Sequence, residues 1–180
     1  MLEKDIKKVL ITEERLKERI AELANTISKD YEGKDLLFIV ILRGAFVFAS
    51  DLFKRIKNFC EVDFMAVSSY GSGTQSTGEV KILKDLANSI EGKDVIIVED
   101  ILDTGITLSN LIKMLKVRNP ASIEICTCLN KPERRKVDIY AKYIGFDVEN
   151  EFIVGYGLDY DEKYRNLPYI GALKEEVYTR

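Results

Sequence analysis

Two apolar runs constrain the fold of this chain more than any other feature of its sequence. They form the centres of DLLFIVIL at residues 35–42 and KDVIIVED at residues 93–100. Neither centre alternates between apolar and polar side chains, so a strand built from it needs cover on both faces. Doubly covered strands are typical of a mostly parallel, twisted sheet with flanking helices. The two runs therefore predict an α/β fold.

The rest of the chain supplies the helices and further strands of such a sheet. A first helix is expected to begin after Thr12 as its N-cap and to end before Gly33. Its apolar positions recur at helical spacing: Leu16, Ile20, Leu23 and Ile27. Further helices are expected at residues 46–58 and 105–119, strands at residues 60–70, 80–86 and 121–130, shorter extended segments at residues 139–148 and 151–156, and an irregular tail after these.

The chain has the length and the continuity of a single domain. It contains 180 residues and no internal repeat, low-complexity tract or linker rich in proline, glycine or serine. The strands at residues 60–70 and 80–86 are expected to pair in antiparallel fashion across the loop between them. We therefore expect one domain over residues 1–180.

Residue composition excludes several classes of function. The chain has no histidine, which excludes histidine-ligated metal sites and Ser-His-Asp chemistry. The three cysteines do not form a disulfide framework, and Cys126 and Cys128 are expected to be small buried residues on one face of a strand. A formal net charge of −3 argues against a nucleic-acid partner.

No segment of the sequence predicts a membrane partner. The N-terminal stretch MLEKDIKKVLITEE is charged and lacks the apolar centre of a secretion signal, and no apolar run reaches transmembrane length. We therefore expect a cytoplasmic protein in a reducing compartment.

Polar residues follow each buried strand of the predicted sheet. In open α/β sheets, ligands bind at the carboxyl ends of the strands. The groups in question are Arg43-Gly44, Glu99-Asp100 with Asp103-Thr104, Asn130-Lys131, and Gly157 with Asp159. The fold is expected to bring these groups, which are far apart in the sequence, to one rim of the sheet.

The segment Asp103-Thr104-Gly105-Ile106-Thr107 is expected to open a helix. Unpaired N–H groups and the helix dipole at such a position favour an anion, and Gly105 allows a positive φ and a close approach of the backbone. The alternative is an ordinary helix capped by Asp103 or Thr104. The two acids that precede this segment, Glu99 and Asp100, are costly to bury without partners, but they suit sugar hydroxyls or Mg²⁺. An anion cradle beside carboxylates therefore indicates a phosphosugar as ligand.

Five motifs of the sequence resemble those of type I phosphoribosyltransferases. The segment VIIVEDILDTGITL at residues 95–108 is similar to the phosphoribosyl-diphosphate signature of that family: an apolar strand, two acids, two apolar residues, then D-T-G-x-T. Four further motifs occur along the chain in the order found in the bacterial hypoxanthine-guanine branch of the family: LRGAF and SSYGS before this segment, and CLNKPERR and EFIVGYGLDYDEKYRNLPYIG after it. The resemblance covers nearly the whole chain.

The resemblance implies a reaction and a fold. A 6-oxopurine, hypoxanthine and by expectation guanine, would attack C1 of phosphoribosyl diphosphate and release pyrophosphate, giving IMP or GMP in purine salvage. Mg²⁺ would accompany the diphosphate. The fold would be the type I phosphoribosyltransferase fold, with a small hood built from about residues 1–12 and 150–180. The resemblance also implies a homodimer or a homotetramer.

The resemblance assigns the phosphoribosyl group to residues 99–107. Glu99 and Asp100 would bind the ribose 2′ and 3′ hydroxyls and stabilise positive charge on the ribose ring as the C1–O bond breaks. Asp103 would be the catalytic base at purine N7. The 5′-phosphate would be bound by Thr104, Gly105 and Thr107, with the backbone N–H groups of Asp103 and Ile106.

The resemblance assigns the purine and Mg²⁺ mainly to segments that follow residue 130. Lys131 would donate to purine O6, Phe152 would stack on the base, and the backbone of Ile153 would read its Watson–Crick edge. The alternatives are that Lys131 is a solvated lysine and that Phe152 is a core residue. Three further basic side chains are interpreted as surface residues: Arg134, Arg135 and Lys136. Asp159 would lie in the purine segment and bind Mg²⁺, with Glu99 and Asp100 as further metal ligands. In isolation, Asp159 and Arg165 would be interpreted as solvated surface.

Pyrophosphate would be bound by Arg43, Gly44 and Arg165. Many relatives carry Lys at position 43, and the family often has a cis peptide between positions 43 and 44. Ser69 and Tyr70, with the loop GSGTQSTGE at residues 71–79, match a mobile loop that closes over the site and excludes water.

Two other functions fit the sequence less well. A nucleotide-sensing RNA-binding regulator on the same fold would need a basic face with exposed aromatic side chains, which the acidic composition does not favour. A receiver-type signalling domain would need acids after its first strand, where this chain has Arg43-Gly44.

Overall fold

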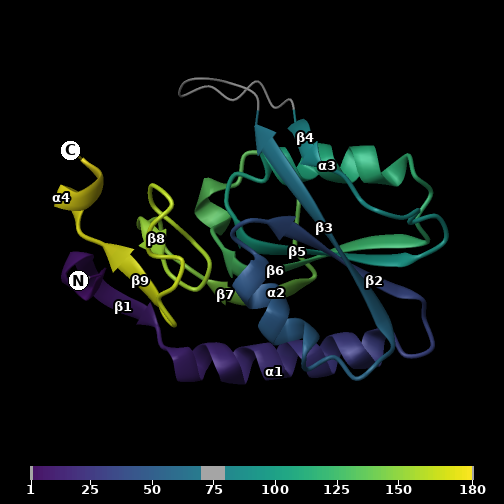
Figure 1. Cartoon of the computed structure of the whole chain (residues 1–180), viewed down its shortest axis with the longest axis horizontal. Coiled ribbons are helices and arrows are strands. Elements are labelled where there is room, and N and C mark those ends of the chain that lie inside the picture. The colour runs from purple at the N-terminus through teal and green to yellow at the C-terminus, as the bar shows by residue number, and fades with distance from the viewer. Residues whose placement is uncertain (1, 70–79, 180) are drawn as a thin grey trace.

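The computed structural model describes residues 2–69 and 80–179, which form two sheets (Figure 1). The larger sheet contains, in spatial order, β4 (Val80–Lys84), β3 (Cys60–Ser69), β2 (Leu36–Leu42), β5 (Asp94–Leu102), β6 (Ser122–Asn130) and β7 (Tyr143–Asp147). All neighbouring strands in it are parallel except β3 and β4, which are antiparallel. The predicted α/β fold and the predicted antiparallel pair are both confirmed.

The two apolar runs form the central strands β2 and β5, and each is covered on both faces. Phe38 and Val40 of β2 pack in one core cluster with residues of α1 (Glu13–Asp30) and α2 (Phe46–Phe53). Ile39 and Ile41, which alternate with them, pack in a second cluster with residues of α3 (Ile106–Lys116). Figure 1 shows α1 and α2 on one side of the sheet and α3 on the other.

Helix α1 begins and ends as its sequence predicts. The Thr12 side chain accepts a hydrogen bond from the Arg15 N–H at 3.3 Å, and the helix ends at Asp30. Helix α2, in contrast, ends at Phe53, five residues before the expected end. The chain turns back at that point, and the Asn58 side chain donates to the carbonyls of Ser28 and Tyr31 at the end of α1. The segment after Phe53 therefore contacts the end of α1 and does not continue α2.

The smaller sheet joins the two ends of the chain. Strand β9 (Ile170–Leu173) lies between β1 (Ile6–Ile11) and β8 (Ile153–Val154) and is antiparallel to both. Two short helical segments flank it, η1 (Leu2–Asp5) and α4 (Glu175–Tyr178). The irregular tail expected from the sequence is wrong for Ile170–Leu173. Its sequence, IGAL, has no strand alternation, and it is extended because it is paired on both sides and completely buried.

Cys126 and Cys128 are buried in the cluster beneath α1 and α2, as expected, and burial raises the pKa of both thiols.

No helix within residues 2–69 and 80–179 combines the length and the apolar composition needed to cross a membrane.

Candidate active site

Three of the polar groups after the buried strands meet at one rim of the large sheet. β2, β5 and β6 are parallel, so their carboxyl ends lie at the same edge. A Cβ on Gly44 would lie 1.6 Å from Oδ2 of Asp100, and a Cβ on Gly157 would lie 2.1 Å from the Gly44 carbonyl oxygen. Only glycine permits these approaches, so the segment after β2 is in direct contact with Asp100 of β5 and with Gly157, which follows β8.

The prediction of a cis peptide in the loop after β2 is wrong in its position. The cis peptide joins Leu42 to Arg43 rather than Arg43 to Gly44. Neither peptide precedes proline, so the residue types in this loop do not mark which one is cis. The exposed Arg43 side chain forms an ion pair with Glu162 at 2.9 Å.

Glu99 and Asp100 lie near the end of β5 as two adjacent, partly buried acids. Burial raises the pKa of Glu99 well above its usual value, and the negative charge of Asp100 adds to this rise. Burial also raises the pKa of Asp100, although one of its oxygens accepts a hydrogen bond from the Ile101 N–H at 2.7 Å. Each acid is therefore poorly compensated within the protein and favours a ligand that offers hydroxyl groups or positive charge.

The start of α3 has the geometry of an anion cradle. Gly105 is the N-cap, with a φ of 79° and no side-chain cap on the helix. The alternative of a helix capped by Asp103 or Thr104 is therefore wrong; Thr104 Oγ1 accepts only a long hydrogen bond, at 3.5 Å, from the Ile106 N–H. A Cβ on Gly105 would lie 2.4 Å from a methyl carbon of Ile139, so the close packing also requires glycine. A hydrogen bond as long as that to Thr104 is weak, so a phosphate can compete for the N–H groups at the helix start.

Asp103 is held by two arginines that the sequence analysis assigned to the surface. Arg134 Nε lies 2.7 Å from Asp103 Oδ1, and Arg135 donates to the Asp103 carbonyl and to Oδ1 of Asn130. The short helical turn η2 (Pro132–Arg134) directs both side chains back to the rim. Arg134 and Lys136 are exposed, as expected, whereas Arg135 is half-buried, so the surface assignment was wrong for Arg135. It also did not foresee that either arginine contacts Asp103. Their position just after a strand end was the signal that could have identified them.

Lys131 is buried, so the alternative of a solvated lysine is wrong. Its Nζ donates to the carbonyl of Glu151 at 2.7 Å, directly before Phe152. Burial lowers the pKa of Lys131, while the charge of Asp103 opposes this shift. Lys131 therefore lies between Asp103 and the segment that contains Phe152 and Ile153.

Phe152 presents a partly open aromatic ring and is not a core residue. It is 39% exposed, its ring stacks on Tyr178 with centroids 4.6 Å apart, and Tyr160 meets its edge at 5.3 Å. Ile153 is buried and pairs with Ala172 of β9. Sequence reasoning missed Tyr178, because the stack depends on the pairing of β8 with β9.

Asp159 and Arg165 form an ion pair at 2.9 Å, and both side chains are mostly buried, so the alternative of solvated surface is wrong. Arg165 also donates to the Gly157 carbonyl at 2.9 Å and approaches Glu162 at 3.2 Å. Because Glu162 also contacts Arg43, it links the two arginines that were assigned to pyrophosphate. Glu162 was not identified from the sequence.

Ser69 ends β3 at the same edge of the sheet. Leu42, the last residue of β2, pairs with Ala66, so β3 continues three residues past the end of β2. Tyr70 and the loop at residues 71–79, which were assigned to the closing loop, lie outside the described residues.

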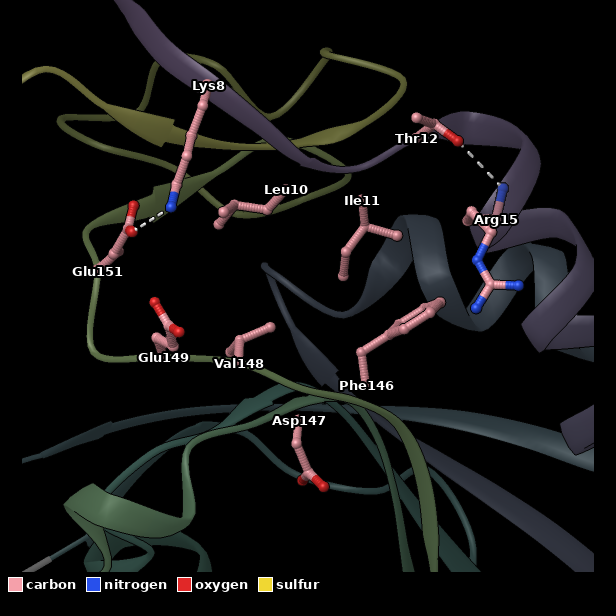
Figure 2. Close-up of a pocket in the computed structure, with 10 residues that line it drawn as sticks. All are labelled: Lys8, Leu10, Ile11, Thr12, Arg15, Phe146, Asp147, Val148, Glu149 and Glu151. Carbon is pink, nitrogen blue, oxygen red and sulfur yellow. Dashed lines mark hydrogen bonds and ion pairs between the residues drawn. The ribbon is translucent and has the colours of Figure 1, made fainter.

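A separate pocket of about 430 Å³ lies between β1, the start of α1 and residues 146–151. None of the residues assigned to the site lines it. Figure 2 shows the Lys8 side chain extending to Glu151 at one end of the pocket, where the two form an ion pair at 2.6 Å. Glu151 therefore anchors its segment twice, through its side chain to Lys8 and through its carbonyl to Lys131.

Comparisons with known proteins agree with this geometry. A family model described as a phosphoribosyl transferase domain matches residues 10–161. The chain is 57% identical, over the full length of both chains, to a hypoxanthine-guanine phosphoribosyltransferase of Streptococcus thermophilus. It is also 57% identical to one of Staphylococcus aureus, with 97% of this chain and 98% of the other covered. A crystal structure of a hypoxanthine phosphoribosyltransferase from Staphylococcus aureus matches with a TM-score of 0.97 and 55% identity, covering 99% of this chain and 97% of that one.

Proposed function

This chain belongs to the phosphoribosyl transferase family, and from that membership we propose that it is a purine-salvage enzyme. It transfers the 5-phosphoribosyl group from phosphoribosyl diphosphate to hypoxanthine and guanine, giving IMP or GMP and pyrophosphate. The observation that carries this function is the 57% identity to hypoxanthine-guanine phosphoribosyltransferases over the whole chain. No specific observation favours the alternative of an RNA-binding regulator.

A spectrophotometric assay tests the function directly. The purified chain is incubated with phosphoribosyl diphosphate, Mg²⁺ and each of hypoxanthine, guanine, xanthine and adenine. We expect nucleotide formation with hypoxanthine and guanine and little with adenine. Absence of turnover with every base would contradict the proposal, and the comparison among bases measures the purine preference.

The phosphoribosyl group is proposed to lie along residues 99–107. The open N–H groups at the start of α3, with Thr104 and Thr107, would bind the 5′-phosphate. Glu99 and Asp100 would accept hydrogen bonds from the ribose hydroxyls. Their negative charge would also favour the cationic ribose of the transition state, whose charge grows as the C1–O bond breaks. Asp103 would accept the proton from purine N7 as N9 attacks C1.

The purine is proposed to lie between Lys131 and Phe152. The Lys131 ammonium, now bonded to the Glu151 carbonyl, is close enough to this segment to turn toward a purine O6. The partly exposed ring of Phe152 would stack on the base, and the backbone at Ile153 would meet its Watson–Crick edge. Tyr178 and Tyr160 would support the Phe152 ring from behind and at its edge.

Lys131→Met is expected to weaken the distinction between purines. A buried donor that meets O6 rejects adenine, whose amino group cannot accept and leaves the lysine unpaired. We expect kcat/KM for hypoxanthine to fall about 100-fold or more, and the ratio of hypoxanthine to adenine activity to shrink. Lys136→Met, in the same segment but exposed, is the matched control. An unchanged hypoxanthine-to-adenine ratio in Lys131→Met would contradict the role.

Pyrophosphate is proposed to lie between the loop after β2 and Arg165. The guanidinium of Arg165 is suited to binding a diphosphate. It now pairs with the carboxylates of Asp159 and Glu162, and the oxygens of pyrophosphate would take the place of these carboxylate oxygens. Arg43 also pairs with Glu162. Movement of Glu162 would therefore free both arginines to bind pyrophosphate. Residues 70–79, which lie outside the described residues, are proposed to be the loop that excludes water during the reaction.

The donor set at this rim fits Mg²⁺. Among the described residues no group of three or more potential ligand side chains is assembled around a metal position. Mg²⁺, however, is commonly bound by one or two carboxylates together with substrate phosphates and water. Burial raises the pKa of Asp100, and the nearby negative charge of Asp159 contributes to this, so a cation between them would relieve the repulsion. We propose that Asp159, with Glu99 and Asp100, binds the ion, which would neutralise charge on the departing diphosphate.

The assembly proposed for the chain is a homodimer or a homotetramer. Four large apolar side chains of α2 and β3 are at least one-third exposed on one face and surround a groove of about 330 Å³: Phe46, Phe53, Val62 and Phe64. An apolar patch of this kind is typical of a protein interface. We propose that a second copy covers it. The native mass should then be at least twice the 20.6 kDa of one chain, and a monomeric mass would contradict the proposal.

The small sheet of β1, β8 and β9 is proposed to be the hood over the purine, because β8 directly follows Phe152.

A cytoplasmic location is proposed because the three cysteines are free thiols, as in proteins of reducing compartments.

A further inference from the structure

Arg134 contacts both sides of the proposed purine site. Its Nε lies 2.7 Å from Asp103 Oδ1, and its NH1 donates to Asn150 Oδ1 at 3.0 Å. Asp103 follows β5, whereas Asn150 precedes the purine segment at residues 151–153, 47 positions later in the chain. We propose that Arg134 is a positioning residue, which sets the orientation of the Asp103 carboxylate relative to the purine segment. This inference rests on the proposed function of Asp103 as the base at N7.

The main chain of Asp103 is held separately from its side chain. Arg135 donates to the Asp103 carbonyl and to Asn130, which in turn donates to Asp147 at 2.7 Å. The backbone of Asp103 is thereby tied to the ends of β6 and β7. Rotation of the carboxylate about its own side-chain bonds remains, and the ion pair with Arg134 restricts that rotation.

The two oxygens of the Asp103 carboxylate have different surroundings. Oδ1 is buried and, within the part of the chain that the structure describes, accepts no hydrogen bond in addition to its ion pair with Arg134. The side chain as a whole is nevertheless 38% exposed, so its exposed surface belongs to atoms other than Oδ1. Arg134 thus holds the buried oxygen in place, and Oδ2 is the oxygen that remains to accept a proton from a purine.

An arginine suits this task better than a lysine. Its planar guanidinium donates from several nitrogens at fixed angles, so one side chain can contact Asp103 and Asn150 together. Because Arg134 is 44% exposed and Asp103 38% exposed, the ion pair adds little to the stability of the fold. The contribution of Arg134 is therefore expected in catalytic geometry, and the Arg134→Ala variant is expected to fold.

A double-mutant cycle measures whether Arg134 acts through Asp103. The rate of nucleotide formation in a single turnover, with saturating substrates, is compared among the wild type, Arg134→Ala, Asp103→Asn and the double variant. We expect Arg134→Ala to lower this rate about 10- to 100-fold, with an unchanged KM for phosphoribosyl diphosphate. In the Asp103→Asn background, the same change should lower the rate less than about twofold, because the group that it positions is already inactive.

Two controls separate positioning from general damage. Arg118→Ala also breaks a surface ion pair, with Asp85 at 2.8 Å, and should leave the rate unchanged. An 8-aza analogue of hypoxanthine has a more acidic ring N–H and needs less help from a base. The loss caused by Arg134→Ala should therefore be smaller with the analogue than with hypoxanthine, whereas a structural defect would reduce both rates equally.

The outcomes distinguish the inference from the function on which it rests. A wild type without turnover, or an Asp103→Asn variant with full activity, would overturn the proposed function or the proposed base. If Asp103→Asn is impaired, three results would overturn the role of Arg134 alone: full activity of Arg134→Ala, losses that multiply in the double variant, or equal losses with hypoxanthine and its 8-aza analogue.

Discussion

Asp103→Asn is expected to lower the single-turnover rate of nucleotide formation by about 10²–10⁴-fold, the range typical for removal of a general base. The amide has nearly the shape of the carboxylate but cannot accept the N7 proton. KM values for purine and phosphoribosyl diphosphate should change little, because the phosphate cradle at Thr104–Thr107 and the contacts of Arg135 with the Asp103 backbone do not depend on the carboxylate.

The measurement for Asp103→Asn is a single-turnover experiment, because product release can limit steady-state turnover and hide a slower chemical step. Asp138→Asn is the matched control, since Asp138 is exposed and lies outside the rim. Equal losses in rate and in substrate affinity would show that Asp103 contributes to binding rather than to proton transfer.

Glu99→Gln is expected to stabilise the fold while it impairs the reaction. Burial raises the pKa of Glu99 well above 4.5, and the Asp100 charge adds to this, so the ionised group is less favourable in the folded chain than in the unfolded one. Replacing it by a neutral amide should raise the free energy of unfolding at pH 8 by about 1–2 kcal/mol. For a chain of this length that is a rise in Tm of about 2–8 °C.

The sign of the pH dependence follows from the raised pKa. At a pH below the ordinary pKa of 4.5, Glu99 is protonated in both the folded and the unfolded chain. The free energy of unfolding should then be nearly the same with glutamate as with glutamine at this position. As the pH rises through the folded-state pKa, the group ionises and its unfavourable contribution to folding becomes complete. The stability gained from Glu99→Gln should therefore be small near pH 4 and largest at pH 8, as measured by thermal unfolding at each pH.

Activity should move in the opposite direction in the same variant. Glutamine retains a hydrogen-bond acceptor for a ribose hydroxyl but loses the negative charge that would stabilise a cationic ribose. We expect kcat/KM for phosphoribosyl diphosphate to fall about 10-fold or more. Glu91→Gln, on the exposed turn before β5, should change neither Tm nor activity. A Glu99→Gln protein that is less stable at pH 8 would contradict the argument.

The sequence predicted the large sheet well because the governing signals are local. A helix repeats every 3.6 residues and a strand every two, so the period of apolar residues identifies each element without knowledge of its neighbours. The unbroken runs in β2 and β5 also predicted cover on both faces, and Phe38 and Ile39 do pack in separate clusters. The end of α2 and the strand β9 were mispredicted because each depends on contacts with distant segments.

The candidate site divides in the same way. The sequence by itself determined which segment presents an anion cradle beside acids, because residues 99–107 are contiguous and Gly105 was recognisable as a position with positive φ. It also placed Lys131 and Arg165 in segments that the fold brings to the same rim. Only the tertiary structure decided which side chains meet: Arg134 with Asp103, Tyr178 with Phe152, and Glu162 with both Arg43 and Arg165. Such pairs join residues far apart in the chain, and turns and strand register, which residue periodicity does not encode, determine their distances.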